Sequence, residues 1–345
     1  MARFYTFVSC TFAFTASMFM VSQSHAQEIQ PVGLFQETGI QLVGCETDIA
    51  GGCAADLGCQ GGCNSGCGGT CRETFFNNLT SFLTPGTPCF DDFISPMTNP
   101  VFFEDPRTLT EARAIFIHHQ VPGAAGGGDV QLFAVQLRAA LTENLSLVAA
   151  KDGFITSSNP LIEDGWADVS LGLKYNLYRD PQAQRLLSVG ISYELPWGST
   201  HTLQGNGDGV FDLYVSAGAE FGCGYHYLTT TGLLLPTDTT EESQMWFWSQ
   251  HVDHRIGCSN FYWLGEANMY HYLKSGGGGI NGVEGGDLWN LGSTGVAGST
   301  IVTGALGVKY KPNRNREVGF AWEAPMTKNK DIIDNRLTVD MIFRY

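Results

Sequence analysis

The sequence predicts an all-β fold, a membrane-spanning, antiparallel up-and-down β-barrel of about 12 strands. Three observations lead to this prediction. Short segments alternate between apolar and polar side chains, which is the period of a β-strand. Glycine is abundant, at 43 of 345 residues, and only 15% of the residues are charged. Beyond residue 26 no stretch approaches the ~20 apolar residues of a spanning helix, so strands would have to cross the membrane.

Residues 1–26 have the pattern of a secretory signal peptide. Arg3 precedes a largely apolar run at 4–21, and residues 24–26 read Ser-His-Ala, a small-x-small cleavage site. Threonine and serine dilute the apolar run, which argues against an uncleaved membrane anchor. Residue 27 is Gln rather than Cys, which argues against a lipoprotein anchor. We therefore expect an exported mature chain that begins at Gln27.

Residues 27–107 form a Cys/Gly-rich segment that we expect in the periplasm, ahead of a barrel at 108–345. Its cysteines are Cys45, Cys53, Cys59, Cys63, Cys67, Cys71 and Cys89. Four of them recur at intervals of four, but so much glycine argues against a helix. Disulfides within or between chains are the favoured interpretation for an exported protein. A thiolate metal site, which lacks any Cys-x2-Cys pair, and a flexible linker with no specific thiol role stay open. The segment is expected either to plug the lumen or to anchor the barrel to envelope partners.

The barrel strands are recognised by alternation and by the turns between them. They are expected at 109–120, 129–142, 144–156, 166–178, 184–197, 209–222, 224–235, 244–256, 260–274, 299–311, 316–327 and 335–345. Tight turns and longer loops then alternate along the chain, as periplasmic turns and outer loops do in membrane barrels. Both termini fall on the short-turn side. The strands at 224–235 and 244–256 alternate poorly.

Along each strand, every second residue is mostly polar and the residues between them are mostly apolar. The polar set is expected to face the lumen, and the apolar set to face lipid. The predicted lumen-lining residues are Asp168, Lys174, Glu194, Asp212, Glu220, Glu266, Lys309, Glu323, Asp340 and Arg344. On the apolar, lipid-facing side of the strands, aromatic residues gather at both strand ends, where the two membrane interfaces are expected. They are Tyr175, Phe221, Phe261, Tyr310 and Tyr345 at the short-turn ends, and Trp197, Trp246 and Trp248 at the long-loop ends.

Two cysteines within the barrel sit in tight turns on the short-turn side. Cys223 and Cys258 belong to consecutive hairpins, so about two strand spacings, ~10 Å, separate them. A disulfide usually spans a Cα separation of ~4.4–6.8 Å, so the turns would have to lean together. Flanking glycines make that lean easy, and the periplasm is oxidising. A Cys223–Cys258 disulfide is therefore predicted.

The last strand, 335–345, ends on an aromatic residue. In this it resembles the closing strand of bacterial outer-membrane barrels, in which the final aromatic residue is an assembly signal. The resemblance assigns that role to Phe343 and Tyr345. It also makes the barrel-assembly machinery an expected partner.

Two further segments resemble a single family. Residues 137–150 (LRAALTENLSLVAA) and 164–177 (DGWADVSLGLKYNL) are similar to a "GLTDNLEL" hairpin and a "GLGDLSLGLKY" strand. This hairpin pattern and this strand pattern are those of the outer-membrane barrel family named for phenol-degradation (MetA-pathway) transporters, which the chain resembles. The resemblance covers about 109–345, with Ala139 and Ala140 where the family has Tyr-Gly. It implies a barrel transporter, and neither signature carries a catalytic or binding motif.

The expected function is an outer-membrane channel or transporter for small solutes, with hydrophobic or aromatic solutes as candidates. One alternative is an envelope scaffold crosslinked to another envelope protein through the Cys-rich segment. Another is an outer-membrane hydrolase, for which His271 is the candidate histidine, although no convincing serine partner is found. No enzyme activity, catalytic residue, cofactor or metal is predicted. The location is the bacterial outer membrane, with its lipid as partner. A net charge of -15 and the lack of Lys/Arg clusters argue against nucleic acid.

Overall fold

The computed structural model describes residues 88–222 and 224–345. Three short 3-10 turns and fourteen assigned strand segments make up this part of the chain. The turns are η1 (Pro88–Phe90), η2 (Gly123–Ala125) and η3 (Thr200–Thr202). The strands are β1 (Glu111–Gln120), β2 (Asp129–Ala140), β3 (Leu145–Ala149), β4 (Phe154–Ser157), β5 (Gly165–Trp166), β6 (Val169–Asp180), β7 (Arg185–Leu195), β8 (Val210–Phe221), β9 (Tyr225–Pro236), β10 (Gln244–Arg255), β11 (Phe261–Lys274), β12 (Thr300–Asn313), β13 (Arg316–Pro325) and β14 (Asn335–Arg344).

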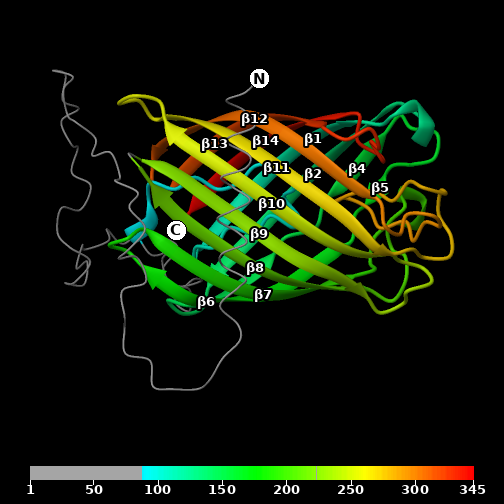
Figure 1. Ribbon diagram of the computed structural model, residues 1–345, viewed down its shortest axis with the longest axis horizontal. Coiled ribbons are helices and arrows are strands. Elements are labelled where there is room, and N and C mark those ends of the chain that lie inside the picture. The colour runs from blue at the N-terminus through cyan, green and yellow to red at the C-terminus, as the bar shows by residue number, and fades with distance from the viewer. Residues whose placement is uncertain (1–87, 223) are drawn as a thin grey trace, which may run out of the picture. The chain divides into compact units, whose positions relative to one another are not determined.

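The strands form one closed antiparallel barrel, in which each strand pairs with its neighbours in sequence (Figure 1). β1 closes the sheet because it pairs with both β2 and β14. β3 and β4 both pair with β2, one after the other, and together form one interrupted strand. β6 pairs with β3 and β5 pairs with β4, so β5 and β6 together form the next interrupted strand. The fourteen segments therefore make twelve strands in the described part of the chain, which confirms the predicted fold class. None of the described helices is long and apolar enough to cross a membrane.

The outer face of the barrel is apolar. Leu306, Leu177 and Phe133 are exposed by 72%, 56% and 52% of their surface. The alternate residues, which face the inside of the barrel, are buried and mostly polar. In β6, for example, Ser170, Lys174 and Asn176 point inward. A barrel in water would show the reverse arrangement, so this outer surface suits lipid.

The third predicted strand, 144–156, is interrupted at 150–153. Gly153 has a φ of +121°, and a Cβ there would lie 2.5 Å from the carbonyl oxygen of Phe133. At this point the side chain of Asp152 replaces a backbone partner, since its Oδ1 accepts a hydrogen bond from Val135 N at 2.9 Å. The interruption is thus a wide bulge, which period-two counting does not detect.

β9 and β10 are regular twelve-residue strands despite their weak alternation. Their inward positions include Leu228, Leu234, Met245 and Phe247, all buried. Apolar side chains therefore occupy both faces here. The reason is that these inward residues pack against the segment that precedes β1.

Candidate functional site: the lumen and the segment inside it

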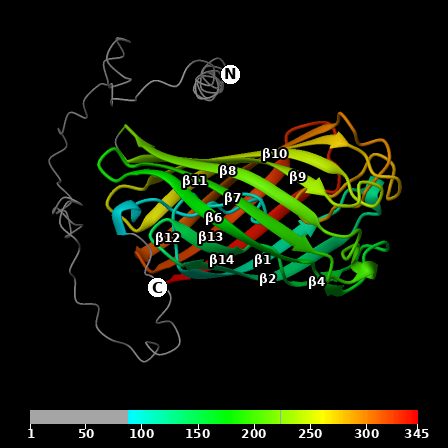
Figure 2. The same cartoon turned by 90° about the horizontal axis from the view of Figure 1, so that it is seen from below.

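Residues 88–107, here called the lumenal segment, run inside the barrel ahead of β1. They form the cyan ribbon that starts at the end where the C terminus lies (Figures 1 and 2). From residue 93 to 110 every side chain except that of Val101 is buried. Residues 27–107 are predicted to be periplasmic and either to plug the lumen or to anchor the barrel, and their described part, 88–107, lies within the barrel as the first alternative expects. Cys45, Cys53, Cys59, Cys63, Cys67, Cys71 and residues 1–26 lie outside the described residues.

Apolar side chains of the lumenal segment pack against the barrel wall at three separate places. Phe90 and Phe93 form one cluster with Leu186 and Leu228. Ile94 and Met97 contact Tyr262, Leu264 and Ala321. Phe102 stacks on Phe247 with ring centroids 5.0 Å apart. Burial of these side chains stabilises the segment inside the barrel.

Side chains of the wall also satisfy the backbone of the segment. Glu266 accepts hydrogen bonds from Met97 N at 2.7 Å and from Thr98 N at 2.6 Å. Further bonds reach carbonyl oxygens of the segment: Lys309 Nζ to Ser95 at 2.8 Å, Gln136 Nε2 to Pro100 at 2.7 Å, and Ser188 Oγ to Pro106 at 2.5 Å. A buried segment needs such partners because water does not reach it. It is held by side chains and not as an additional strand.

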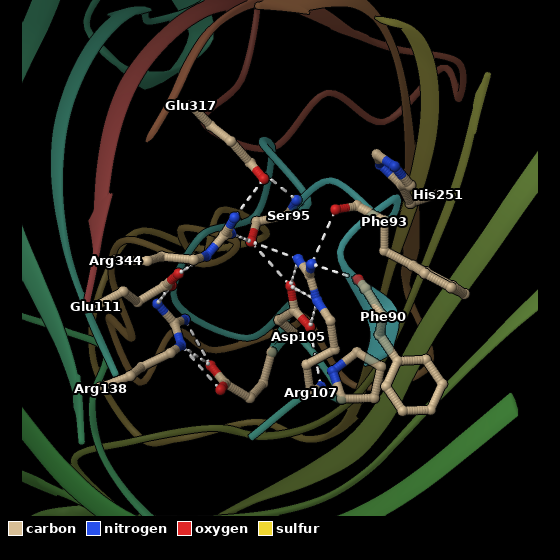
Figure 3. Close-up of polar contacts among 12 residues, drawn as sticks. Phe90, Phe93, Ser95, Asp105, Arg107, Glu111, Arg138, His251, Glu317 and Arg344 are labelled. Atoms are coloured by element: carbon tan, nitrogen blue, oxygen red, sulfur yellow. Dashed lines mark hydrogen bonds and ion pairs between the residues drawn. The ribbon is translucent and has the colours of Figure 1, made fainter. Parts of the chain in front are cut away.

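A network of charges connects the segment to the short-turn end of the lumen (Figure 3). Within the segment, Arg107 Nη2 lies 2.6 Å from Asp105 Oδ2. On the wall, Arg344 contacts Glu111 at 2.8 Å and Glu317 at 2.5 Å. Arg344 also donates to Ser95 Oγ of the segment at 2.8 Å. These groups neutralise one another in a space that bulk water does not fill.

The predicted lumen-lining residues lie on the inner side of the strands. Buried on the inner face are Asp168, Lys174, Asp212, Glu266, Lys309, Glu323 and Asp340. The side chains of Glu194 and Arg344 are 15% and 7% exposed, and Glu220 is half-buried. They do not form one ring. Lys309 contacts Asp340 at 3.0 Å, whereas Glu194 pairs with Lys151 at 2.5 Å and Asp168 holds Gly198 N and Gly205 N of an outer loop.

Sequence reasoning missed the charges of the segment itself, Glu104, Asp105 and Arg107. The dense stretch Phe-Glu-Asp-Pro-Arg at 103–107 was a signal, but it precedes the first strand and was counted with the periplasmic part. A buried chain of His226, Asp253, His251 and Glu266 was also missed. Its three contacts are 2.8, 2.9 and 2.7 Å long. These residues lie on three different strands, so their alignment depends on register.

The long loops fold over the other end of the barrel. In the loop 275–299, Leu288, Trp289 and Leu291 join an apolar cluster with Ile332 and Ile333. Trp289 Nε1 donates to Thr202 O at 3.0 Å, which fixes the indole across the mouth. Two small cavities of about 20 and 10 Å³, each about the space of one water, adjoin this cluster. A more open hollow of about 540 Å³ lies among the outer loops, at Leu161, Leu203 and Gly278. The outer loops and the lumenal segment therefore both narrow the lumen.

The remaining predictions concern the cysteines, the aromatic residues and a hydrolase. Cys223 lies outside the described residues, so its disulfide with Cys258 stays a prediction, as does the assembly role of Phe343 and Tyr345. Cys89 belongs to η1 and is half-buried. His271 is partly buried, and its Nδ1 lies 2.8 Å from Thr300 Oγ1. That hydroxyl is the hydrogen-bonding partner of His271 among the described residues, so no Ser–His pair forms at this position.

Comparisons with known proteins bear on the fold. No protein-family model and no curated protein matches the sequence. Among solved structures, a COG4313 outer membrane channel from Pseudomonas putida F1 aligns with a TM-score of 0.53 at 11% identity, over 73% of this chain and 100% of that one. A KdgM porin has a TM-score of 0.40 at 10% identity, over 68% of this chain and 99% of that one. The CymD monoaromatic hydrocarbon channel has 0.35 at 11%, over 68% and 88%. The alignment with the Pseudomonas putida F1 protein shows that the chain has the fold of an outer-membrane β-barrel.

Proposed function

We propose that this chain is an outer-membrane channel for small solutes, which its own lumenal segment keeps closed. The observation that carries the proposal is the way the segment is held. Side chains bind it through separate hydrogen bonds and ion pairs, such as those of Glu266 with Met97 N and Thr98 N. A segment held in this way can leave without breaking a strand pair of the barrel.

The solute class is proposed to include hydrophobic or aromatic molecules, in line with the resemblance to phenol-degradation transporters. Residues 27–87 are proposed to lie in the periplasm, because the described chain enters the barrel from the short-turn end. Lipid and the barrel-assembly machinery are the proposed partners.

Swelling of vesicles that contain the purified protein tests the proposal. Glu266→Gln leaves an amide that can accept through one oxygen only, so one backbone donor of the segment loses its partner. We expect faster swelling with small solutes such as phenol and glycerol than for the unchanged chain. Glu163→Gln, an exposed change in an outer loop, serves as the control. Equal and negligible swelling for all three proteins would contradict a channel function.

A further inference from the structure

We infer that the lumenal segment occupies a binding site for small aromatic carboxylates, and that such a ligand opens the channel by replacing Glu104. This inference rests on the proposed channel function. It assigns a ligand class and a site to the same lumen.

The site is formed by two cationic side chains of the barrel wall, Arg138 and Lys174, here called the cradle. The guanidinium of Arg138 on β2 grips Glu104 as a fork, with Nε 2.9 Å from Oε1 and Nη2 2.6 Å from Oε2. Lys174 Nζ on β6 lies 2.7 Å from the same Oε1. The side chains of both cations are almost fully buried, at 2% and 1% exposure. A planar fork plus an ammonium group is the arrangement that recognises a carboxylate.

Among the described residues, the wall supplies one carboxylate in direct contact with this cradle, that of Glu111, and the buried Asp212 of β8 lies nearby without contacting either cation. Lys174 contacts two acceptors among the described residues, Glu104 and the carbonyl oxygen of Asp105, and both belong to the segment. Arg138 keeps one wall partner, Glu111, through Nη1 at 3.1 Å. When the segment leaves, the fork face of Arg138 and the ammonium of Lys174 lack a counter-ion. The two cationic groups remain next to one another on the wall, in the arrangement that binds a carboxylate.

An aromatic site lies beside the cradle. Glu104 N donates to Phe102 O at 3.0 Å, so a tight turn brings residues 102 and 104 together. Phe102 stacks on Phe247 of the wall and belongs to the same buried apolar cluster as Tyr214. The Tyr214 hydroxyl is buried and has no hydrogen-bonding partner in the described part of the chain. Departure of Phe102 would therefore leave an aromatic pocket with one free hydroxyl.

The segment thus presents an aromatic ring and a carboxylate, two residues apart in one tight turn, to these two sites. A ligand that combines both groups, such as benzoate, fits the cradle and the aromatic pocket only when Phe102 and Glu104 are out. It binds the open state and not the closed one, so it shifts the population toward the open state. Phenol lacks the carboxylate and acetate lacks the ring, so each can replace only half of the contacts.

Planar-bilayer recordings of the full-length protein test this inference. We expect benzoate to raise the open probability roughly tenfold, within the usual range of coupling between a ligand and a conformational change. Phenol and acetate at equal concentration and ionic strength should have little effect. Glu104→Gln should be open more often without ligand and should respond less to benzoate. Asp92→Asn, an exposed change in the same segment, should respond like the unchanged chain.

The outcomes separate the two proposals. If Glu104→Gln conducts but benzoate, phenol and acetate act alike on the unchanged chain, the ligand site is wrong and the channel function stands. If no variant conducts although each runs as a folded barrel on an unheated gel, the channel function fails, and the ligand site with it. Benzoate gating in the unchanged chain that Lys174→Gln weakens supports the cradle.

Discussion

At the scale of single residues, the approach of the segment to the wall depends on glycine. Gly319 of β13 faces the lumen, and a Cβ there would lie 2.5 Å from Met97 Sδ and 2.6 Å from Asp340 Oδ1. Real Cβ contacts are not this short, so a larger residue would have to displace its neighbours. Gly265 on β11 differs, since the nearest atom to its Cβ position is 3.8 Å away.

Gly319→Ala should therefore loosen the lumenal segment. The added methyl group competes with Met97 for space, and overpacking of this kind costs about 1–3 kcal/mol. We expect residues 88–107 to be cleaved faster by added protease and the open probability to rise. Gly265→Ala is the matched control and should behave like the unchanged chain. Equal protection in both variants would show that Met97 does not depend on Gly319.

At the scale of elements, the outer loop 275–299 contains a carboxyl group that senses pH. Burial raises the pKa of Glu284 to about 7, although Gly292 N and Ser293 N donate to its oxygens at 2.9 and 2.8 Å. Burial also raises the pKa of Asp331, which accepts a hydrogen bond from Glu284 N at 2.6 Å. In both groups the folded loop favours the protonated form.

The closed loop should therefore be more stable in acid than in base. For a carboxyl group with a raised pKa, the stabilisation is complete below the unfolded value near ~4.5 and is lost as pH rises through about 7. Hydrogen exchange in 275–299 should show more opening at pH 8 than at pH 5, after correction for intrinsic rates. Glu284→Gln should flatten this dependence. A loop that opens more at pH 5 would contradict the assignment.

The turns at the other end carry the predicted Cys223–Cys258 disulfide. If it exists, neither thiol should react with an alkylating reagent until reductant is added, and unreduced peptides should be linked. Alkylation of both thiols without reductant would refute it. The disulfide would join the hairpins β8–β9 and β10–β11 at the short-turn end.

Alternation predicted nearly every strand because one face meets lipid and the other does not. Alternation failed as a guide where the inner face of a strand packs against the lumenal segment. Inward Leu228, Leu234 and Phe247 weaken the pattern of β9 and β10 because they pack on the lumenal segment. The segment itself has no strand period, so its place in the lumen could not be predicted from periodicity. Likewise, the pairing of Arg138 with Glu104 depends on the path of the segment, which the strand pattern does not give.

At the scale of the whole barrel, closure depends on the last strand. β14 pairs along its full length with β1, and Tyr345 N donates to Thr110 O at 3.0 Å. Tyr345→Ala should reduce the amount of barrel in the outer membrane more than it reduces the stability of barrel already folded. Loss of one ring at the interface costs only a few kcal/mol. Tyr310→Ala, another exposed aromatic residue at the same rim, is the control. Normal membrane levels of Tyr345→Ala would contradict the assembly role.

The central claim is that residues 88–107 close a barrel that otherwise conducts. Single-channel recording of the full-length protein beside a variant that lacks residues 27–107 tests it directly. We predict rare, brief openings for the full-length chain and a steady conductance for the shortened one. A shortened barrel that is folded and still closed would contradict the claim, because the outer loops alone would then seal the lumen.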